Sequence, residues 1–255
     1  MKNGLLVSTV FFLFVVSCSS VTGTDQFARM REIADDSNLT EPQKTTIRHN
    51  ATQLAFQSVY AEDSTFIDLP DDEIDFYYDL LVTIVNSDAG KEYIPIVANL
   101  NMFPQYSPFS LSVSALNSAP FYENWTDSTI ETGIDEIDEL LVNRGFYIQR
   151  IYDWSFNENL VFSLASTQAY NTIQISRLLE STNFFEYAHT SYTCCDGSNI
   201  IVEETDRYYG MNALKVTYLY KYGDCPSGCT NMDYYIFKIY ESGKVEFVEK
   251  QLSNY

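Results

Sequence analysis

The sequence contains few basic residues and very few histidines. Lys and Arg together number 15 against 35 Asp and Glu, so the formal net charge is −20 at pH 7, and there are only 2 His. Proteins that bind nucleic acid need clustered cations to displace the counterions of the phosphate backbone. The composition therefore excludes nucleic acid as a partner. It is typical of an acidic, well-solvated surface, which by itself specifies no ligand.

Recognisable catalytic motifs are absent as well. The chain has no Gly-x-Ser-x-Gly, no P-loop, no dinucleotide fingerprint and no His-Glu-x-x-His. The acidic clusters at 71–75 and 135–139 lack EF-hand spacing, and they fit the first turns or solvent faces of helices. We therefore expect a non-enzymatic binding or envelope-assembly protein without cofactor or metal. The alternative is a hydrolase of glycan or another envelope polymer, using paired carboxylates such as Asp135 or Glu136.

Long apolar runs are confined to the N-terminus. Leu5 to Val16 is an apolar run after a short basic start. No later segment approaches the roughly 18 unbroken apolar residues that a membrane-spanning helix needs. We therefore expect an exported protein with a cleaved leader.

The leader ends in Val15-Val16-Ser17-Cys18, which resembles a bacterial lipobox. The resemblance implies a signal peptide at 1–17, acylation of Cys18 and a membrane anchored through lipid. Ser19 after the cysteine resembles outer-membrane sorting, so we expect a cell-envelope location, and residues 18–38 read as a tether. The alternative is an ordinary signal peptide cut near Ser17 or Ser19.

The other four cysteines are Cys194, Cys195, Cys225 and Cys229, an even number that can pair in an oxidising compartment. A hairpin of 200–204 with 213–222, in which opposed residue numbers sum to about 417, brings the vicinal pair near the second pair. We therefore expect disulfides from Cys194 and Cys195 to Cys225 and Cys229. Metal or redox chemistry at the Cys-x-x-x-Cys segment is the alternative.

Hydrophobic periodicity predicts an α+β fold with antiparallel sheets. Helices are expected from Thr40, from Pro70, over 133–143 and over 172–180. Strands are expected at 92–98, 109–115, 146–152, 160–166, 184–191 and 198–204, followed by a meander to the C-terminus in which Leu214, Val216, Tyr218, Tyr220 and Tyr222 face inward. Helix-strand-strand order thus recurs about three times. The loop 117–120 divides a helix-led half, 39–117, from a second half, 121–255, that ends in the disulfide-linked sheet.

Residues 194–250, from Cys-Cys-Asp-Gly-Ser-Asn-Ile through Gly-Asp-Cys-Pro-Ser-Gly-Cys to Gly-Lys-Val-Glu-Phe-Val, resemble the C-terminal region of uncharacterised lipoproteins from Bacteroidota-type bacteria. The helix-rich part with Pro70 and Tyr77-Tyr78 is similar to the same group more loosely. The resemblance implies a compartment and no activity.

Two tryptophans are the candidate ligand-binding residues. Trp125 and Trp154 lie in expected loops and, with 20 Tyr in the chain, could stack against a sugar. Packing in a core or at its rim is the alternative. A glycan or an envelope protein is therefore the expected partner.

Overall fold

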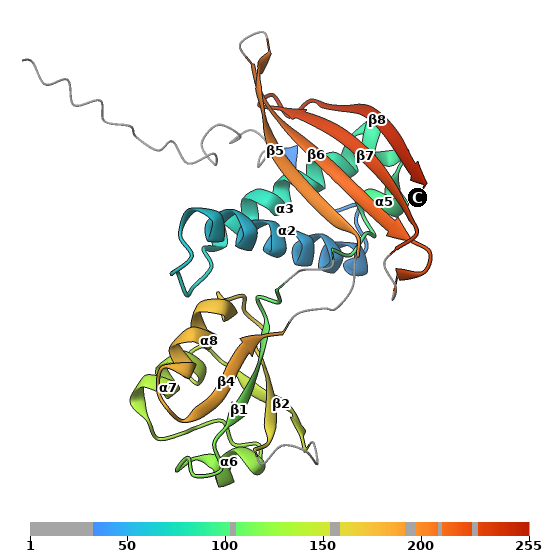
Figure 1. Ribbon diagram of the computed structural model, residues 1–255. Coiled ribbons are helices and arrows are strands. Elements are labelled where there is room, and N and C mark those ends of the chain that lie inside the picture. The colour runs from blue at the N-terminus through green and yellow to red at the C-terminus, as the bar shows by residue number, and fades with distance from the viewer. Residues whose placement is uncertain are drawn as a thin grey trace, which may run out of the picture.

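The computed structural model describes residues 33–102, 106–153, 159–191, 197–208, 211–225 and 229–254. These residues form helices and two antiparallel four-stranded sheets (Figure 1). One sheet has the strand order β2-β3-β1-β4 and the other has the order β5-β6-β7-β8. The predicted α+β class with antiparallel sheets is confirmed.

The helices are α2 (Glu41–Glu62), α3 (Asp71–Asn86), α4 (Asp88–Lys91), α5 (Ile94–Val97), α6 (Tyr122–Thr126), α7 (Asp135–Leu141) and α8 (Thr172–Glu180). The strands are β1 (Ser110–Ala115), β2 (Tyr147–Tyr152), β3 (Val161–Ala165), β4 (Phe185–Thr190), β5 (Asn199–Tyr208), β6 (Met211–Tyr222), β7 (Asn231–Tyr240) and β8 (Val245–Asn254).

The first and last parts of the chain form one unit, which we call the discontinuous unit. Helices α2, α3 and α5 cover one face of the β5–β8 sheet (Figure 1). A single hydrophobic core joins them, with Leu54 and Leu81 from the helices and Val216 and Phe237 from the sheet all buried. The helices and this sheet therefore stabilise each other by burying apolar surface in common.

The middle of the chain forms a second unit, the inserted unit, with β1–β4 and helices α6–α8. It has its own core, in which Leu111, Phe162 and Trp125 are fully buried. β1 lies between β3 and β4 and pairs with both in antiparallel register. Figure 1 shows the inserted unit below the discontinuous unit.

The predicted division into 39–117 and 121–255 does not correspond to these cores. β1 belongs to the inserted unit, whereas the strands after residue 198 pack on the first helices. A stripe of apolar residues on a helix shows which face is buried, but it does not show which segment covers that face. The helices α2 and α3 are covered by the sheet formed at the other end of the chain.

Several local predictions are confirmed. Helix α2 begins after Thr40, as expected, and the Thr40 backbone N–H donates to the Gln43 side chain at 3.0 Å in a capping box. Helix α3 begins directly after Pro70, and α8 has the expected bounds Thr172–Glu180. Gly145, at φ 67°, follows α7 in the left-handed conformation expected of a residue that ends a helix.

The strand predicted at 92–98 is wrong, because this segment contains the helical turn α5. Pro95 occupies the first turn of α5, where a missing N–H costs no hydrogen bond. Helix-strand-strand order recurs as α7-β2-β3 and α8-β4-β5. The first helices lead only to β1 in the described residues, so the order is found twice and not the expected three times. The predicted tether also ends early, since Asp36 already accepts a hydrogen bond from Tyr78 at 2.7 Å.

Two crossings join the units, and their ends lie side by side. The Ser107 N–H donates to the carbonyl of Ser191 at 2.8 Å, and the Ser191 N–H donates to the carbonyl of Ser110 at 3.1 Å. The Thr172 hydroxyl donates to the Ser107 carbonyl at 2.7 Å. These bonds fix the chain where it enters and leaves the inserted unit.

The C-terminal sheet is a meander, as predicted, with the order β5-β6-β7-β8. β5 pairs Ile200 with Tyr218, one residue from the predicted register. Tyr218 and Val216 are fully buried as predicted, but Tyr220 and Tyr222 are 37% and 36% exposed.

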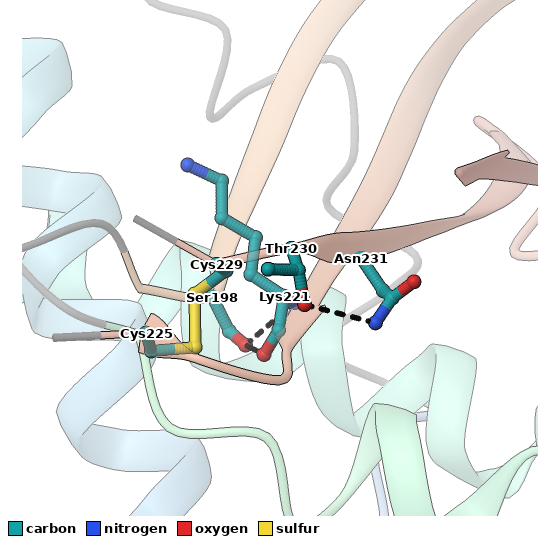
Figure 2. The surroundings of a disulfide bond; sticks show 6 residues. All are labelled: Ser198, Lys221, Cys225, Cys229, Thr230 and Asn231. Carbon is teal, nitrogen blue, oxygen red and sulfur yellow. Dashed lines mark hydrogen bonds between the residues drawn. A yellow bond between two sulfur atoms is a disulfide. The ribbon is translucent and has the colours of Figure 1, made fainter. Parts of the chain in front are cut away.

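The disulfide pairing differs from the prediction. Cys225 is bonded to Cys229, within the loop between β6 and β7 (Figure 2). The last pair of the β6–β7 ladder is Tyr222 with Asn231, so these cysteines occupy facing positions in the loop that follows it. The prediction used only the β5–β6 register and therefore overlooked this pairing. Cys194 and Cys195 lie outside the described residues.

Candidate functional site

A cleft of about 970 Å³ lies where the two units meet, and we call it the junction cleft. Its walls come from α2, from the segment that leads into α3, and from the segment that precedes α8. The lining residues are Asp36, Lys44, Thr45, Arg48, His49, Thr52, Asp68, Leu69, Asp71, Ile74, Tyr78, Phe109, Thr167, Gln168, Ala169 and Tyr170.

Helix α2 supplies one wall through side chains spaced four residues apart. Lys44 and Arg48 lie on adjacent turns, as do Thr45 and His49, so all four reach the cleft from one side of the helix. The opposite face of α2 carries the buried residues Ile47 and Leu54 and packs against the sheet. The burial of Ile47 and Leu54 in this core thus orients the polar groups of α2 toward the cleft.

The cations of this wall are already paired. The Arg48 Nη1 is 2.6 Å from Asp75 Oδ1, and its guanidinium lies 5.7 Å from the centre of the Tyr78 ring. The Lys44 ammonium is 3.5 Å from the carboxylate of Asp36. These pairs reduce the positive charge available to a ligand.

Tyr78 is held as a hydrogen-bond donor. Its hydroxyl donates to Asp36 at 2.7 Å. Burial, followed by this hydrogen bond to Asp36, raises the pKa of Tyr78. The phenol is therefore neutral at physiological pH, and it contributes an aromatic face to the cleft.

His49 is a half-buried, neutral imidazole. Its ring stacks on Phe109 with centroids 5.8 Å apart. Burial lowers the pKa of His49. Within the described residues its ring nitrogens have no hydrogen-bond partner, so one donor and one acceptor remain for a ligand.

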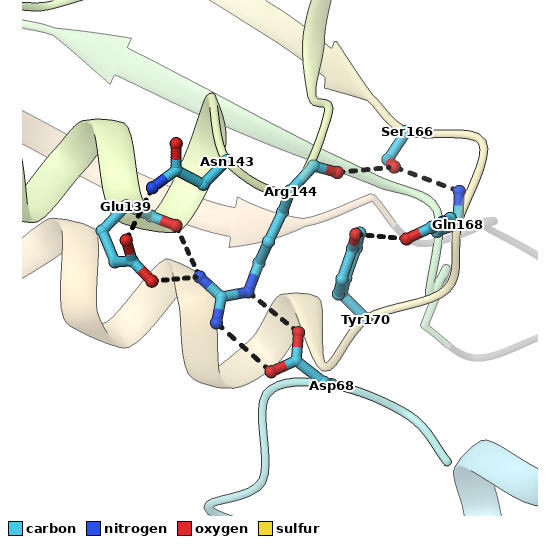
Figure 3. Close-up of polar contacts among 7 residues, drawn as sticks. All are labelled: Asp68, Glu139, Asn143, Arg144, Ser166, Gln168 and Tyr170. Atoms are coloured by element: carbon cyan, nitrogen blue, oxygen red, sulfur yellow. Dashed lines mark hydrogen bonds and ion pairs between the residues drawn. The ribbon is translucent and has the colours of Figure 1, made fainter. Parts of the chain in front are cut away.

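The opposite wall is tied to the discontinuous unit by an ion pair that we call the latch (Figure 3). The Nε and Nη2 of Arg144 lie 3.1 and 3.3 Å from the two carboxylate oxygens of Asp68. The Arg144 side chain is only 15% exposed, and its Nη1 also donates to the carbonyl of Glu139. Two short parallel contacts of this kind fix both position and orientation.

Backbone contacts and apolar packing reinforce the latch. Asp68 forms an isolated antiparallel bridge with Tyr170, and the Asn171 N–H donates to the carbonyl of Ile67 at 2.8 Å. The Ile67 side chain packs against the core of the inserted unit, while Ile173 packs against the core of the discontinuous unit. The two units therefore share a packed interface beside the cleft.

Gln168 and Tyr170 complete the wall contributed by the inserted unit. The Tyr170 hydroxyl donates to Gln168 Oε1 at 2.8 Å, as Figure 3 shows. Burial, followed by the charge of Asp68, raises the pKa of Tyr170. The amide nitrogen of Gln168 remains as a donor.

None of the candidate residues that lie within the described part of the chain lines the cleft. Trp125 is fully buried in the inserted unit, where its indole N–H donates to the carbonyl of Ile130 at 2.9 Å. It has no exposed ring face to stack on a sugar, so the core role left open by the sequence is the one observed. Trp154 and Cys18 lie outside the described residues. Asp135 and Glu136 begin α7 and do not line the cleft.

The sequence does carry one weak signal for the cleft. Residues 44–49 contain Lys44, Arg48 and His49 without any acidic residue, in a chain of strongly negative charge. This short basic segment, in a chain of negative net charge, corresponds to the wall of the cleft that α2 supplies. Nothing in the sequence links it to Gln168 or Tyr170, which are far away along the chain.

Among the described residues, no helix is long and apolar enough to cross a membrane. In the same part of the chain, no group of three or more His, Cys, Asp or Glu side chains is arranged to hold a metal ion.

No family model matches the chain, and no curated protein or solved structure matches it either.

Proposed function

We propose that the chain is an exported, lipid-anchored binding protein whose ligand occupies the junction cleft. The observation that carries the proposal is the cleft itself, about 970 Å³ in volume and lined by side chains of both units. Pockets of roughly 300–1,000 Å³ with apolar surface and a few convergent polar groups are the usual form of a ligand site. His49, Gln168 and Asp71 supply the polar groups, and Phe109 and Tyr78 supply aromatic surface.

The anchor is proposed from the lipobox-like sequence that ends at Cys18. Two or more acyl chains on this cysteine suffice for stable membrane attachment without a spanning helix. Metabolic labelling with a palmitate analogue should mark the wild-type chain, and Cys18→Ser should abolish the label. A label that survives the substitution would refute lipid attachment at Cys18.

A glycan-directed hydrolase is the second candidate, because three carboxylates line the cleft: Asp36, Asp68 and Asp71. Asp68 is bound to Arg144, and Asp36 accepts from Tyr78 and pairs with Lys44. Among the described residues, only Asp71 of the three has no polar partner. Glycoside hydrolysis generally needs two carboxylates that face each other across the bond. Because Asp36 and Asp68 are already engaged by other side chains, the cleft favours a binding function over hydrolysis.

The two candidates differ in what they do to a polymer. Incubation of the mature chain with neutral polysaccharides should release no reducing ends above the background of an Asp71→Asn variant. Release by the wild type that is lost in Asp71→Asn would establish the hydrolase instead.

A further inference from the structure

We infer that the ligand of the junction cleft is a neutral carbohydrate, a deeper inference that rests on the proposed binding function. Three properties of the lining lead to this class: its compensated charge, its uncommitted hydrogen-bonding groups and its aromatic faces. Each of them discriminates against a different alternative.

The compensated charge discriminates against anions. Lys44 lies 3.5 Å from Asp36 and 3.4 Å from Glu41, and Arg48 lies 2.6 Å from Asp75. An anionic ligand would have to compete with these carboxylates for the cations. It would also approach Asp71, whose charge has no partner among the described residues. Repulsion of this kind disfavours the wrong charge class.

The uncommitted polar groups suit hydroxyls. The neutral His49 offers one donor and one acceptor, the Thr167 hydroxyl can do both, and the Gln168 amide keeps its N–H donors. No hydrogen bond within the described residues uses His49 or Thr167. A sugar presents adjacent hydroxyls that each donate and accept, so it can satisfy these groups together without bringing a charge.

The aromatic groups suit the apolar face of a sugar ring. His49 and Phe109 form a stacked pair on the wall, and Tyr78 adds a further ring to the lining. Aromatic side chains give large contact area and few rotamers to immobilise. A pyranose has one face of C–H groups and an edge of hydroxyls, which matches aromatic surface next to polar groups.

The backbone of the walls disfavours an extended peptide. Peptides that bind in extended form usually add a strand to an exposed sheet edge. The junction cleft is instead lined by α2, by α3 and the segment that leads into it, by Phe109 ahead of β1, and by the segment before α8. The backbone of α2 already uses its N–H and C=O groups within the helix.

Native gel electrophoresis with polysaccharide in the gel tests the inference. The mature chain is run against neutral polymers, namely dextran, β-glucan, mannan, xylan and galactan, and against dextran sulfate and polygalacturonate as anionic counterparts. Retardation against polymer concentration gives a dissociation constant. At least one neutral polymer should retard the wild type, and neither anionic polymer should.

Variants locate the binding. His49→Ala and Gln168→Ala should each weaken it about tenfold, as expected when a hydrogen bond in a partly desolvated site is lost. His189→Ala on β4 and Gln251→Ala on β8 remove the same residue types from exposed positions and should leave the affinity unchanged. His49→Phe keeps the ring and removes the nitrogens, so it should also lose affinity even if the alanine variant folds poorly.

The outcomes separate the ligand class from the function. Retardation by an anionic polymer that depends on Arg48, without retardation by any neutral polymer, overturns the carbohydrate class and leaves cleft binding intact. Neutral binding that is unchanged in all the His49 and Gln168 variants overturns the assignment to the cleft. No retardation by any polymer of either panel overturns the carbohydrate class alone.

Discussion

The latch between Arg144 and Asp68 makes a quantitative prediction about how the two units are held together. Arg144 contacts both carboxylate oxygens of Asp68, at 3.1 and 3.3 Å. Exposed ion pairs contribute about 0.2–1 kcal/mol. The Asp68 side chain is 68% exposed, but Arg144 is 15% exposed and the geometry is bidentate. We therefore expect a coupling energy at the upper end of that range, about 1 kcal/mol.

Arg144→Ala should cost more than this coupling. The substitution also removes the hydrogen bond from Nη1 to the Glu139 carbonyl, about 1.5 kcal/mol for a charged donor. It further removes the packing of the buried part of the side chain. The expected loss in the free energy of unfolding is about 3 kcal/mol, whereas Asp68→Ala should lose about 1 kcal/mol.

A double-mutant cycle measures the coupling. Urea unfolding is followed for the wild type, Asp68→Ala, Arg144→Ala and the double variant. The exposed pair of Asp88 and Lys91, with N–O distance 3.5 Å, is the control and should show no measurable coupling. A latch coupling no larger than that of the control would refute the view that this ion pair fastens the units.

Three further predictions follow from the described residues. Burial lowers the pKa of His49, so its contribution to stability is fully present above about pH 6.5 and is lost as the pH falls from there to the lower folded-state value. His49→Gln should therefore flatten the dependence of Tm on pH between about 7 and 5, with the exposed His189→Gln as control and an unchanged slope as the contrary result. Trp125→Ala should destabilise the inserted unit by about 3–5 kcal/mol in urea, because the ring is fully buried, and a loss under 1 kcal/mol would contradict its place in the core. Replacing Cys225 and Cys229 together by serine should lower the free energy of unfolding by about 2 kcal/mol, the chain-entropy value for a five-residue loop. Peptide mapping of the unreduced chain should recover these two cysteines linked to each other, and a link from either to Cys194 or Cys195 would be the opposing outcome.

Local structure was predictable wherever short-range chemistry decides it. The capping box of Thr40 with Gln43, and the alternation of Leu111 and Val113 with serines in β1, depend on residues a few positions apart. The structure follows both patterns. The failed strand at 92–98 had an equally local cause, because Pro95 fits the first turn of a helix as well as a sheet edge.

Long-range packing was not predictable from the same patterns. The alternating apolar and aromatic residues of β6 continue through Tyr220 and Tyr222, yet these two side chains are more than one third exposed. The pattern alone does not show how far along a strand the covering helices extend. For the same reason, the sequence pattern did not predict that α2 and α3 pack against the C-terminal sheet.

The junction cleft shows this limit most clearly. None of the three residues stands out in its own segment: His49 is a polar residue on a helix, Phe109 precedes a strand, and Gln168 lies in a loop. They line one cleft only because the latch and the hydrogen bonds at the two crossings bring the units together. The tryptophans were candidate ligand-binding residues because of their side-chain chemistry. Trp125 is buried in the core, so it cannot stack against a ligand.

Hydrogen–deuterium exchange with the best neutral oligosaccharide from the binding panel tests the central claim most directly. If the ligand lies between the units, peptides covering 43–52 and 167–171 should be protected together when it is added, and both protections should be lost in Gln168→Ala. Protection of one of these segments without the other, or protection confined to the β5–β8 sheet, would contradict a binding site at the junction.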